Sequence, residues 1–399
     1  MARTKLSFLK DVLIAALASY GGPEAHYGIF SSYLVEKKGY LSEEELTEMI
    51  GLYSLVPGPS STQTITAIGY HVGGPWLALL TFLVWAFPAI LIMALFAVFF
   101  TRINSNESWQ PLLQYLPLVA TAFILYAAVN LSRKVLKSRE DGVLWGIMII
   151  LSYLLKGKSM WVVPLLLLSG GLISMLWERH RAGEQTKLAE GLPEKSEALR
   201  PQWLILGIVI GIALLNELLR VFFPSAWMTL YTSFYRYGYS VIGGGQIVIP
   251  LMIEDLVRAE SLISMQDFLA GYAIDQAVPG PLFSFAAFVS ARSIPGVLSS
   301  LLAGVMGGLS IFLPGLLLVY FMHPLWKKTR GQAKVKDFLK GVSVTAASLI
   351  VVTALTQVLQ LEPSIVNILI LGLSTLTLLK KWIPAPFLVF IAAGLGFLV

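Results

Sequence analysis

Two stretches of this chain carry the same glycine and proline interruptions at the same spacing. Gly21-Gly22-Pro23 lies 36 residues before Pro57-Gly58-Pro59, and Gly243-Gly244-Gly245 lies 36 residues before Pro279-Gly280-Pro281. The offset of 222 residues between the two stretches continues as far as Pro164. A shared offset over such a length indicates an internal duplication. In an apolar chain, paired Gly/Pro interruptions in the two halves are typical of the binding site of a transporter.

The composition predicts an all-α membrane protein that crosses the bilayer several times. Hydrophobic residues make up 56% of the 399 residues and charged residues only 13%, whereas soluble domains carry about 25% charged residues. Long apolar runs approach or reach the length of about 20 residues that a membrane-spanning helix needs. These runs are residues 76–100, 112–131, 204–219 and 297–322.

The positive net charge of +6 does not indicate nucleic-acid binding. The basic residues form short clusters at the ends of apolar runs, where they orient a membrane protein. The N-terminus resembles a signal peptide, but Asp11 interrupts its apolar stretch and the segment has a counterpart in the second half. We therefore expect this segment to be retained. The absence of cysteine excludes disulfides and thiolate chemistry.

The duplication divides the chain into four parts. We predict a first repeat at 1–178, a charged cytoplasmic linker at 179–202, an unpaired inverting transmembrane helix at 203–222, and a second repeat at 223–399. Each repeat is expected to contain an interrupted apolar segment, a helix that stops at Pro-Gly-Pro, a short helix, a long spanning helix and three further helices.

Loop charges predict that the two repeats have opposite orientations in the membrane. The loop after the first long helix holds one basic residue, Arg102, whereas the corresponding region of the second repeat holds six: Lys327, Lys328, Arg330, Lys334, Lys336 and Lys340. Because basic loops stay in the cytoplasm, the first loop is expected outside and the second inside. The fold class is therefore two inverted-topology repeats with broken helices at the midplane, with Met1 cytoplasmic and Val399 external.

A helix broken inside the membrane leaves backbone groups that need partners. The new helix N-termini present N–H donors and partial positive charge, which suits an anion. Packing kinks filled by neighbouring side chains are the alternative. The predicted substrate-binding residues at the four breaks are Gly21, Gly22, Pro23, Pro57, Gly58, Pro59, Ser60, Ser61, Thr62, Gln63, Gly243, Gly244, Gly245, Gln246, Pro279, Gly280 and Pro281.

Four polar residues near the breaks are further candidates. Arg236 lies seven residues before Gly243 and either faces the anion or reaches to the membrane interface. Glu24 has Gln246 as its counterpart, so that this carboxylate either couples transport to protons or caps a helix. His26 either joins Glu24 or bonds a backbone carbonyl, and Asp275 is a third candidate for coupling.

Enzyme chemistry finds little support in the sequence. The four histidines are scattered without metal-ligand spacing. No G-x-x-x-x-G-K-[ST] loop is present for ATP hydrolysis, and no soluble domain is long enough to hold a cofactor. We therefore expect neither catalytic activity nor a cofactor.

Several of these motifs resemble the chromate ion transporter family in its two-domain form. They are Tyr20-Gly21-Gly22-Pro23-Glu24-Ala25-His26, Leu55-Val56-Pro57-Gly58-Pro59 with Ile68-Gly69-Tyr70, Phe87-Pro88-Ala89, Gly243-Gly244-Gly245, and Ala277-Val278-Pro279-Gly280-Pro281. The likeness covers nearly the whole chain. It implies chromate efflux across the cytoplasmic (inner) membrane, with sulfate as the chemically similar oxyanion. The second Pro-Gly-Pro departs from the first, because the residues after Pro281 carry fewer hydroxyls than those after Pro59.

The resulting hypothesis is a secondary transporter for a tetrahedral oxyanion, chromate first and sulfate second, that works by alternating access. A passive anion channel, a transporter of another small anion, and a scaffold or membrane enzyme that uses the linker are the alternatives. The expected partners are the oxyanion and the lipid bilayer, and a homodimer is left open.

Overall fold

The computed structural model describes residues 5–20, 23–54, 56–104, 110–155, 162–182, 203–241, 248–325 and 333–396, in which every regular element is helical. Among these residues, five helices are long and apolar enough to cross a bilayer: Pro75–Phe100, Pro111–Val135, Trp203–Phe222, Val297–Met322 and Lys340–Gln360. The prediction of an all-α, multi-pass membrane protein is confirmed.

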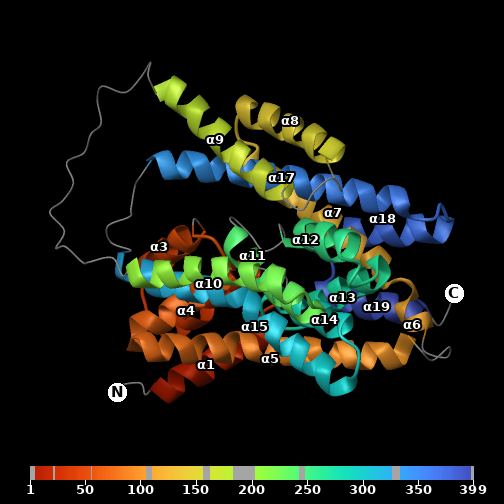
Figure 1. Cartoon of the computed structure of the whole chain (residues 1–399), viewed down its shortest axis with the longest axis horizontal. Helices are drawn as coiled ribbons and strands as arrows, with labels where there is room; N and C mark the ends of the chain where they lie inside the picture. The colour runs from red at the N-terminus through yellow and green to blue at the C-terminus, as the bar shows by residue number, and fades with distance from the viewer. Residues whose placement is uncertain are drawn as a thin grey trace.

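The two repeats show the same order of elements (Figure 1). The first contains α1 (Lys5–Ala18), α2 (Pro23–Ile29), η1 (Phe30–Lys37), α3 (Glu43–Tyr53), α4 (Ser60–Gly73), α5 (Pro75–Asn104), α6 (Pro111–Gln114), α7 (Leu116–Val135), α8 (Arg139–Leu155) and α9 (Val162–Ala182). Helix α10 (Trp203–Phe222) connects it to the second. The second contains α11 (Ala226–Ser240), α12 (Val248–Met252), η3 (Ile253–Ala259), α13 (Met265–Ala277), η4 (Leu282–Ser284), α14 (Phe285–Ser293), α15 (Val297–Met322), η5 (His323–Leu325), α17 (Ala333–Gln360), α18 (Ile365–Lys380) and α19 (Ala385–Leu395).

Equivalent elements begin at equivalent residues because the same local signals are present. Ser42 and Ser264 are N-caps whose side chains accept the backbone N–H of Glu45 and of Asp267, which satisfies a donor that the helix leaves unpaired. Both repeats also place a π-helix, η1 or η3, after the first interruption. Because π-helices are rare and often lie at functional sites, their repetition indicates a shared role.

The helices after the two Pro-Gly-Pro motifs begin differently. Helix α4 starts at Ser60, directly after the first Pro-Gly-Pro, and Pro59 is its N-cap. The ψ of 88° at Pro59 lies outside the helical region. In the second repeat, the 3₁₀ turn η4 precedes α14. The first turn after Pro-Gly-Pro is therefore α-helical in the first repeat and 3₁₀ in the second.

In the first repeat, the segments on either side of each interruption lie antiparallel. The Tyr33 hydroxyl in η1 donates to Asp11 Oδ1 in α1 at 3.0 Å, and the rings of Phe8 and Tyr40 are 4.9 Å apart. At the next interruption, Glu45 at the start of α3 lies 3.6 Å from His71 Nε2 near the end of α4. Both pairs of segments therefore turn back as re-entrant hairpins.

The second repeat contains the equivalent pair of hairpins. Arg236 in α11 contacts Asp255 in η3, and Arg292 at the end of α14 contacts Asp267 at the start of α13. Nearer the tip, the Ser284 hydroxyl lies 2.9 Å from Asp275. The sequence left open whether the broken segments cross or turn back, and these contacts establish that they turn back.

The long helices α5 and α15, which are equivalent in the repeat, lie side by side and antiparallel (Figure 1). The Tyr320 hydroxyl near the end of α15 donates to the Pro75 carbonyl at the start of α5 at 2.7 Å. Gly304, near the start of α15, packs against Ala94 near the end of α5. Since equivalent helices run in opposite directions, the repeats are inverted, as predicted.

A second group of helices, α7, α8, α9, α17 and α18, lies beside the hairpins (upper part of Figure 1). Helix α17 packs against α7, α8 and α9, and glycines allow the close approach to α9. A Cβ atom on Gly341 would lie 2.1 Å from the Gly170 carbonyl oxygen. Lys340 at this contact bonds Asp141 Oδ1 at 2.9 Å and Glu178 Oε1 at 3.0 Å, which ties α8, α9 and α17 together.

The first and last described residues lie at opposite ends of α5. Lys5 lies beside Gly73, just before the start of α5, whereas Gly396 lies against Pro111, just after its end. A helix of 30 residues is about 45 Å long at 1.5 Å per residue, enough to cross the bilayer. The predicted linker begins inside α9, which extends to Ala182, and its residues 183–202 lie outside the described ranges.

Candidate functional site

The tips of hairpins from both repeats meet around a small, partly open cavity. Its wall combines His26 from α2, the first turn of α4 and the start of η4. The lining residues are His26, Pro59, Ser60, Ser61, Thr62, Pro281, Leu282 and Phe283. None of these lining residues is a lysine or arginine. The attraction of this part of the cavity for an anion would come from helix N-termini, hydroxyl groups and His26.

Each Pro-Gly-Pro tip is bonded to the other repeat. The Gly58 N–H donates to the Val241 carbonyl at 2.7 Å, and the Gly280 N–H donates to the Ser19 carbonyl at 2.8 Å. These two hydrogen bonds, which we call the clasps, are equivalent under the offset of 222 residues. Gly58 has φ 123° and Gly280 has φ 132°, a region that essentially only glycine adopts. The glycines are therefore needed to turn both N–H groups toward the opposite repeat.

In the first repeat, three consecutive hydroxyls at the start of α4 each have a partner outside α4. Ser60 Oγ accepts from the Tyr27 hydroxyl at 3.0 Å, and Thr62 Oγ1 accepts from the Trp85 indole N–H at 3.2 Å. Ser61 Oγ lies 3.0 Å from His26 Nδ1. His26 and Trp85 are fully buried, with ring centroids 5.3 Å apart. The burial and these contacts hold the hydroxyls in place.

Gln63 closes the first Pro-Gly-Pro turn. Its Nε2 donates to the Pro57 carbonyl at 2.8 Å and approaches the Gly315 carbonyl of α15 at 3.4 Å. Gln63 is 1% exposed and is absent from the cavity wall. The predicted ligand Gln63 therefore supports the tip in this structure.

In the second repeat, the one hydroxyl in the equivalent turn contacts a carboxyl group. Ser284, the counterpart of Thr62, lies with its hydroxyl 2.9 Å from Asp275 Oδ1. Asp275 is 5% exposed, and its Oδ2 has no hydrogen-bond partner among the described residues. The neighbouring wall is formed by Leu282 and Phe283. The second half-site is thus more apolar than the first, in line with its lower hydroxyl content in the sequence.

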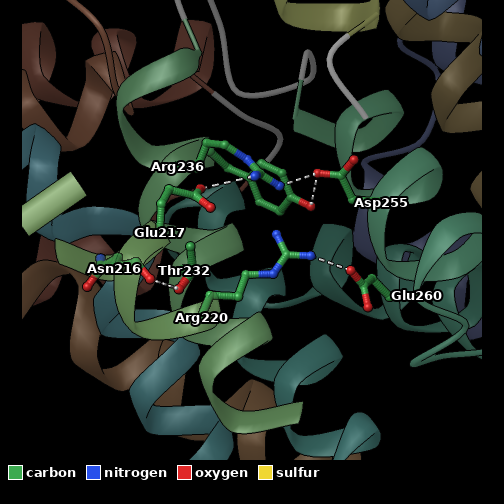
Figure 2. Close-up of polar contacts among 8 residues, drawn as sticks. Asn216, Glu217, Arg220, Thr232, Arg236, Asp255 and Glu260 are labelled. Atoms are coloured by element: carbon green, nitrogen blue, oxygen red, sulfur yellow. Dashed lines mark hydrogen bonds and ion pairs between the residues drawn. The ribbon is translucent and has the colours of Figure 1, made fainter. Parts of the chain in front are cut away.

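The structure places Arg236 in an ion-pair network and not on the cavity wall. Figure 2 shows its guanidinium between Asp255, at 2.8 Å, and Glu217 of α10, at 3.3 Å. The Tyr237 hydroxyl also donates to Asp255, at 2.9 Å. A second pair, Arg220 with Glu260, lies beside this network. Together these contacts join α10 to the first hairpin of the second repeat.

Several predicted site residues lie outside the described part of the chain. Gly21, Gly22 and the segment 242–247, which includes Gly243, Gly244, Gly245 and Gln246, are not described. Helix α2 begins at Pro23 as expected, but the side chains of Pro23 and Glu24 are not described. Among the described residues, no group of three or more His, Asp or Glu could hold a metal ion.

Sequence reasoning missed Tyr27, Trp85 and Asp255. Tyr27 adjoins His26 in sequence, so its place on the same short helix was a usable signal. Trp85 lies within the long apolar helix α5, where an aromatic residue is ordinarily a packing residue. Asp255 is the counterpart of Tyr33, and an acidic residue in an apolar segment was a signal in itself.

Comparisons with known proteins agree with the duplication. The family model described as "Chromate transporter" matches residues 6–175 and again residues 228–397. An uncharacterized transporter of Methanocaldococcus jannaschii is 24% identical over 99% of this chain and 93% of its own length. A probable chromate transport protein of Synechococcus elongatus is 26% identical over 94% and 91%. A chromate transport protein of Cupriavidus metallidurans is 25% identical over 94% and 88%. No solved structure matches the chain.

Proposed function

This chain belongs to the chromate transporter family, and from that premise we propose that it is a secondary transporter that exports chromate, or the related dianion sulfate, across the cytoplasmic membrane by alternating access. The observation that carries the proposal is the cavity at which the hairpin tips of the two repeats meet. A tetrahedral oxyanion offers only acceptors, and the wall offers hydroxyls and the N-terminus of α4, which complement such an ion.

The clasps support alternating access. One pair of hairpins enters from the side of the membrane at which α5 begins, and the inverted pair enters from the opposite side. The Gly58 and Gly280 N–H groups bind carbonyls of the other repeat from these two directions. Loss of one clasp would open the cavity to one side while the other clasp keeps it closed to the opposite side. Two equivalent, separately breakable contacts are what such a cycle requires.

The other predicted residues enter this proposal in two ways. Glu24, His26 and Asp275 are proposed coupling residues, and the wall position of His26 gives it the most direct access to substrate. Arg236 is bound to Asp255 and Glu217 in this structure. A role for Arg236 in substrate binding requires it to leave these partners in another state of the cycle.

Chromate flux into liposomes that contain the purified protein tests the proposal. We expect saturable flux that sulfate inhibits competitively. The variant Thr62→Val should raise the KM about tenfold, because a hydrogen bond to a charged group contributes about 1.5–3 kcal/mol. Thr121→Val is the matched control, since Thr121 is also buried but bonds the Pro117 carbonyl within α7. Normal flux in the double variant Gly58→Ala with Gly280→Ala would refute the site assignment.

The same liposomes separate the alternatives. A passive channel would move chromate down its gradient but would not accumulate it against a gradient in response to a second ion. A scaffold or an enzyme that uses the linker would depend on that segment. We expect deletion of residues 182–198 to leave flux unchanged.

A further inference from the structure

We propose that three side chains determine the direction in which the hydroxyl protons at the start of α4 point. Tyr27 acts on Ser60, Trp85 acts on Thr62, and His26 acts on Ser61. The cavity is thereby specific for oxyanions, and protonation of His26 controls its affinity. The inference rests on the proposed function of the cavity as an anion site and adds positioning residues and a switch to it. Tyr27 and Trp85 are not on the cavity wall, so they act on substrate only through the hydroxyls.

The indole of Trp85 makes Thr62 a donor toward the cavity. An indole N–H can donate a hydrogen bond but cannot accept one. Thr62 Oγ1 must therefore accept the bond at 3.2 Å from Trp85 Nε1, which leaves the proton of Thr62 available to a ligand. Trp85 is fully buried and packs against Phe30 at 5.2 Å between ring centroids, so the N–H has a defined direction.

Tyr27 has the same effect on Ser60. Its hydroxyl donates to Ser60 Oγ at 3.0 Å, and the proton of Ser60 is again available to a ligand. Hydroxyls further along α4 are used differently. Thr64 and Thr66 donate to the carbonyls of the residues four positions earlier, at 2.8 and 2.7 Å. Only the first turn of α4 therefore keeps hydroxyl protons for an anion.

Ser61 differs from Ser60 and Thr62 because its partner, His26, can gain or lose a proton. When His26 is neutral with a lone pair on Nδ1, the Ser61 hydroxyl donates to that nitrogen across the 3.0 Å contact. When His26 binds a proton, Nδ1–H donates to Ser61 Oγ and the Ser61 proton turns to the cavity. The added proton remains on the imidazolium. Protonation therefore supplies a third hydroxyl donor and one positive charge beside the anion.

Three parts of the described structure contact His26 or share the cavity wall with it. Helix α4 presents Ser60, Ser61 and Thr62, α5 presents Trp85, and the opposite tip presents Pro281, Leu282 and Phe283. On α2 itself, Tyr27 follows His26 in sequence, and Glu24 precedes it by two residues with a side chain outside the described set. Glu24 is therefore the group from which a test must distinguish His26.

The first test measures the KM and the maximal rate for sulfate in liposomes. Trp85→Phe and Tyr27→Phe each remove one donor while keeping the ring. Each should raise the KM about three- to tenfold, in keeping with the usual contribution of one hydrogen bond, with a maximal rate within about twofold of wild type. Tyr320→Phe, which removes a hydroxyl bonded to the Pro75 carbonyl, is the control and should leave the KM unchanged.

The variants at Thr62 guard against a purely structural effect. Thr62→Ser keeps the hydroxyl and should retain the wild-type KM, whereas Thr62→Val should resemble Trp85→Phe. Saturable sulfate flux with an unchanged KM in Trp85→Phe and Tyr27→Phe would overturn the inference and leave the proposed function standing. Absence of saturable flux in the wild-type protein would overturn both.

The second test follows the sulfate KM with pH, because sulfate stays a dianion where chromate itself takes up a proton. We expect the wild-type KM to fall as the pH decreases, because His26 then takes up its proton. His26→Asn places a non-titrating amide near Nδ1 and should remove this dependence. His71→Asn, at the far end of α4, should keep it. A wild-type pH dependence in His26→Asn, or its loss in Glu24→Gln alone, would overturn the proposed switch.

Discussion

At the scale of single residues, the two Pro-Gly-Pro glycines carry the contact between the repeats. Their positive φ angles turn the N–H groups of Gly58 and Gly280 to carbonyls of the opposite repeat. The neighbourhoods of the two glycines differ, however. A Cβ on Gly58 would meet the side-chain amide of Gln63 at 2.9 Å and the Cα of Gly315 at 3.2 Å, whereas a Cβ on Gly280 would lie 2.6 Å from Ala89 Cβ on the helix α5.

We therefore predict that Gly280→Ala destabilises the protein more than Gly58→Ala. Both variants force a side chain into a region of φ that costs about 1–3 kcal/mol. Gly280→Ala adds a clash that only a shift of the α5 backbone or of the tip can relieve, whereas the Gln63 amide can rotate away. Thermal unfolding of the two purified variants in detergent gives the comparison. A larger loss for Gly58→Ala would contradict the assigned contacts.

At the scale of helices, glycines determine how closely the spanning helices approach. Gly308 in α15 packs on Ile90 of α5, and a Cβ there would lie 2.7 Å from Ile90 Cγ2. Gly304 and Gly308, which are four residues apart, thus both lie at the contact with α5. Gly372 in α18 has no atom within 4 Å of its Cβ position.

The same substitution should therefore have opposite effects in α15 and α18. Gly308→Ala overpacks the α5–α15 contact and should lower the free energy of unfolding by about 1–3 kcal/mol. In Gly372→Ala the added methyl group enters open space. This variant should leave the free energy of unfolding unchanged or raise it by up to about 1 kcal/mol, because alanine is the better helix former. Denaturation curves of both variants measure the contrast. Equal effects would show that α15 does not approach α5 as described.

The contact among α8, α9 and α17 contributes a pH-dependent element. Burial raises the pKa of Asp141, but hydrogen bonds from Lys340, from the backbone N–H of Lys137 and from Ser138 outweigh burial, and the pKa is lowered below its ordinary value of 3.8. A carboxyl whose pKa is lowered on folding stabilises the folded state above its unfolded pKa. This contribution is lost as the pH falls through the folded pKa.

We predict that Asp141→Asn lowers the free energy of unfolding by about 1–3 kcal/mol near neutral pH, because Lys340 loses a charged partner at a contact between helices. The difference from wild type should stay constant from about pH 8 to pH 5, and it should close only below about pH 4, where wild-type Asp141 takes up its proton. Melting temperatures across this range provide the measurement. A difference that vanishes already near pH 6 would show that Lys340 does not hold Asp141 ionised.

At the scale of the whole molecule, inversion places equivalent elements on opposite sides of the membrane. Lys5 lies near the start of α5, and Gly396 lies near Pro111, the first residue of α6. Helices α5 and α15 run antiparallel, so their C-terminal ends point in opposite directions. By the positive-inside rule, the basic residues that follow α15 in the sequence predict that its C-terminal end is cytoplasmic.

Cysteine labelling should report these sides directly, because the chain contains no native cysteine. We expect Thr4→Cys and Lys334→Cys to react with an impermeant thiol reagent only from the cytoplasmic side. Ser105→Cys should react only from outside. Each single variant serves as the control for the others. Labelling of Ser105→Cys and Lys334→Cys from the same side would refute the inversion.

The sequence by itself determined the local elements and their duplication. The cap Ser42, the Pro-Gly-Pro stop and the apolar run 76–100 are signals in short stretches of sequence, and each of these three reappears 222 residues later. The opposite orientation of the repeats was also predicted from the sequence. Basic residues at helix ends are a local feature of the chain, and they orient the helices in the membrane. Of the predicted site residues, His26, Ser60, Ser61 and Thr62 lie together on the cavity wall, and their roles in binding and coupling stay predictions.

Only the tertiary structure decided whether the interrupted segments cross or turn back, and which side chains meet. A Gly/Pro break has the same local signature in both cases, and the outcome depends on contacts between distant segments, such as Asp11 with Tyr33. Arg236 was an equally good sequence candidate for an anion, but packing brings Asp255 and Glu217 to it. Trp85 reaches Thr62 only because α5 crosses beside α4. Partners of this kind depend on how helices pack, and packing is a property of the whole chain.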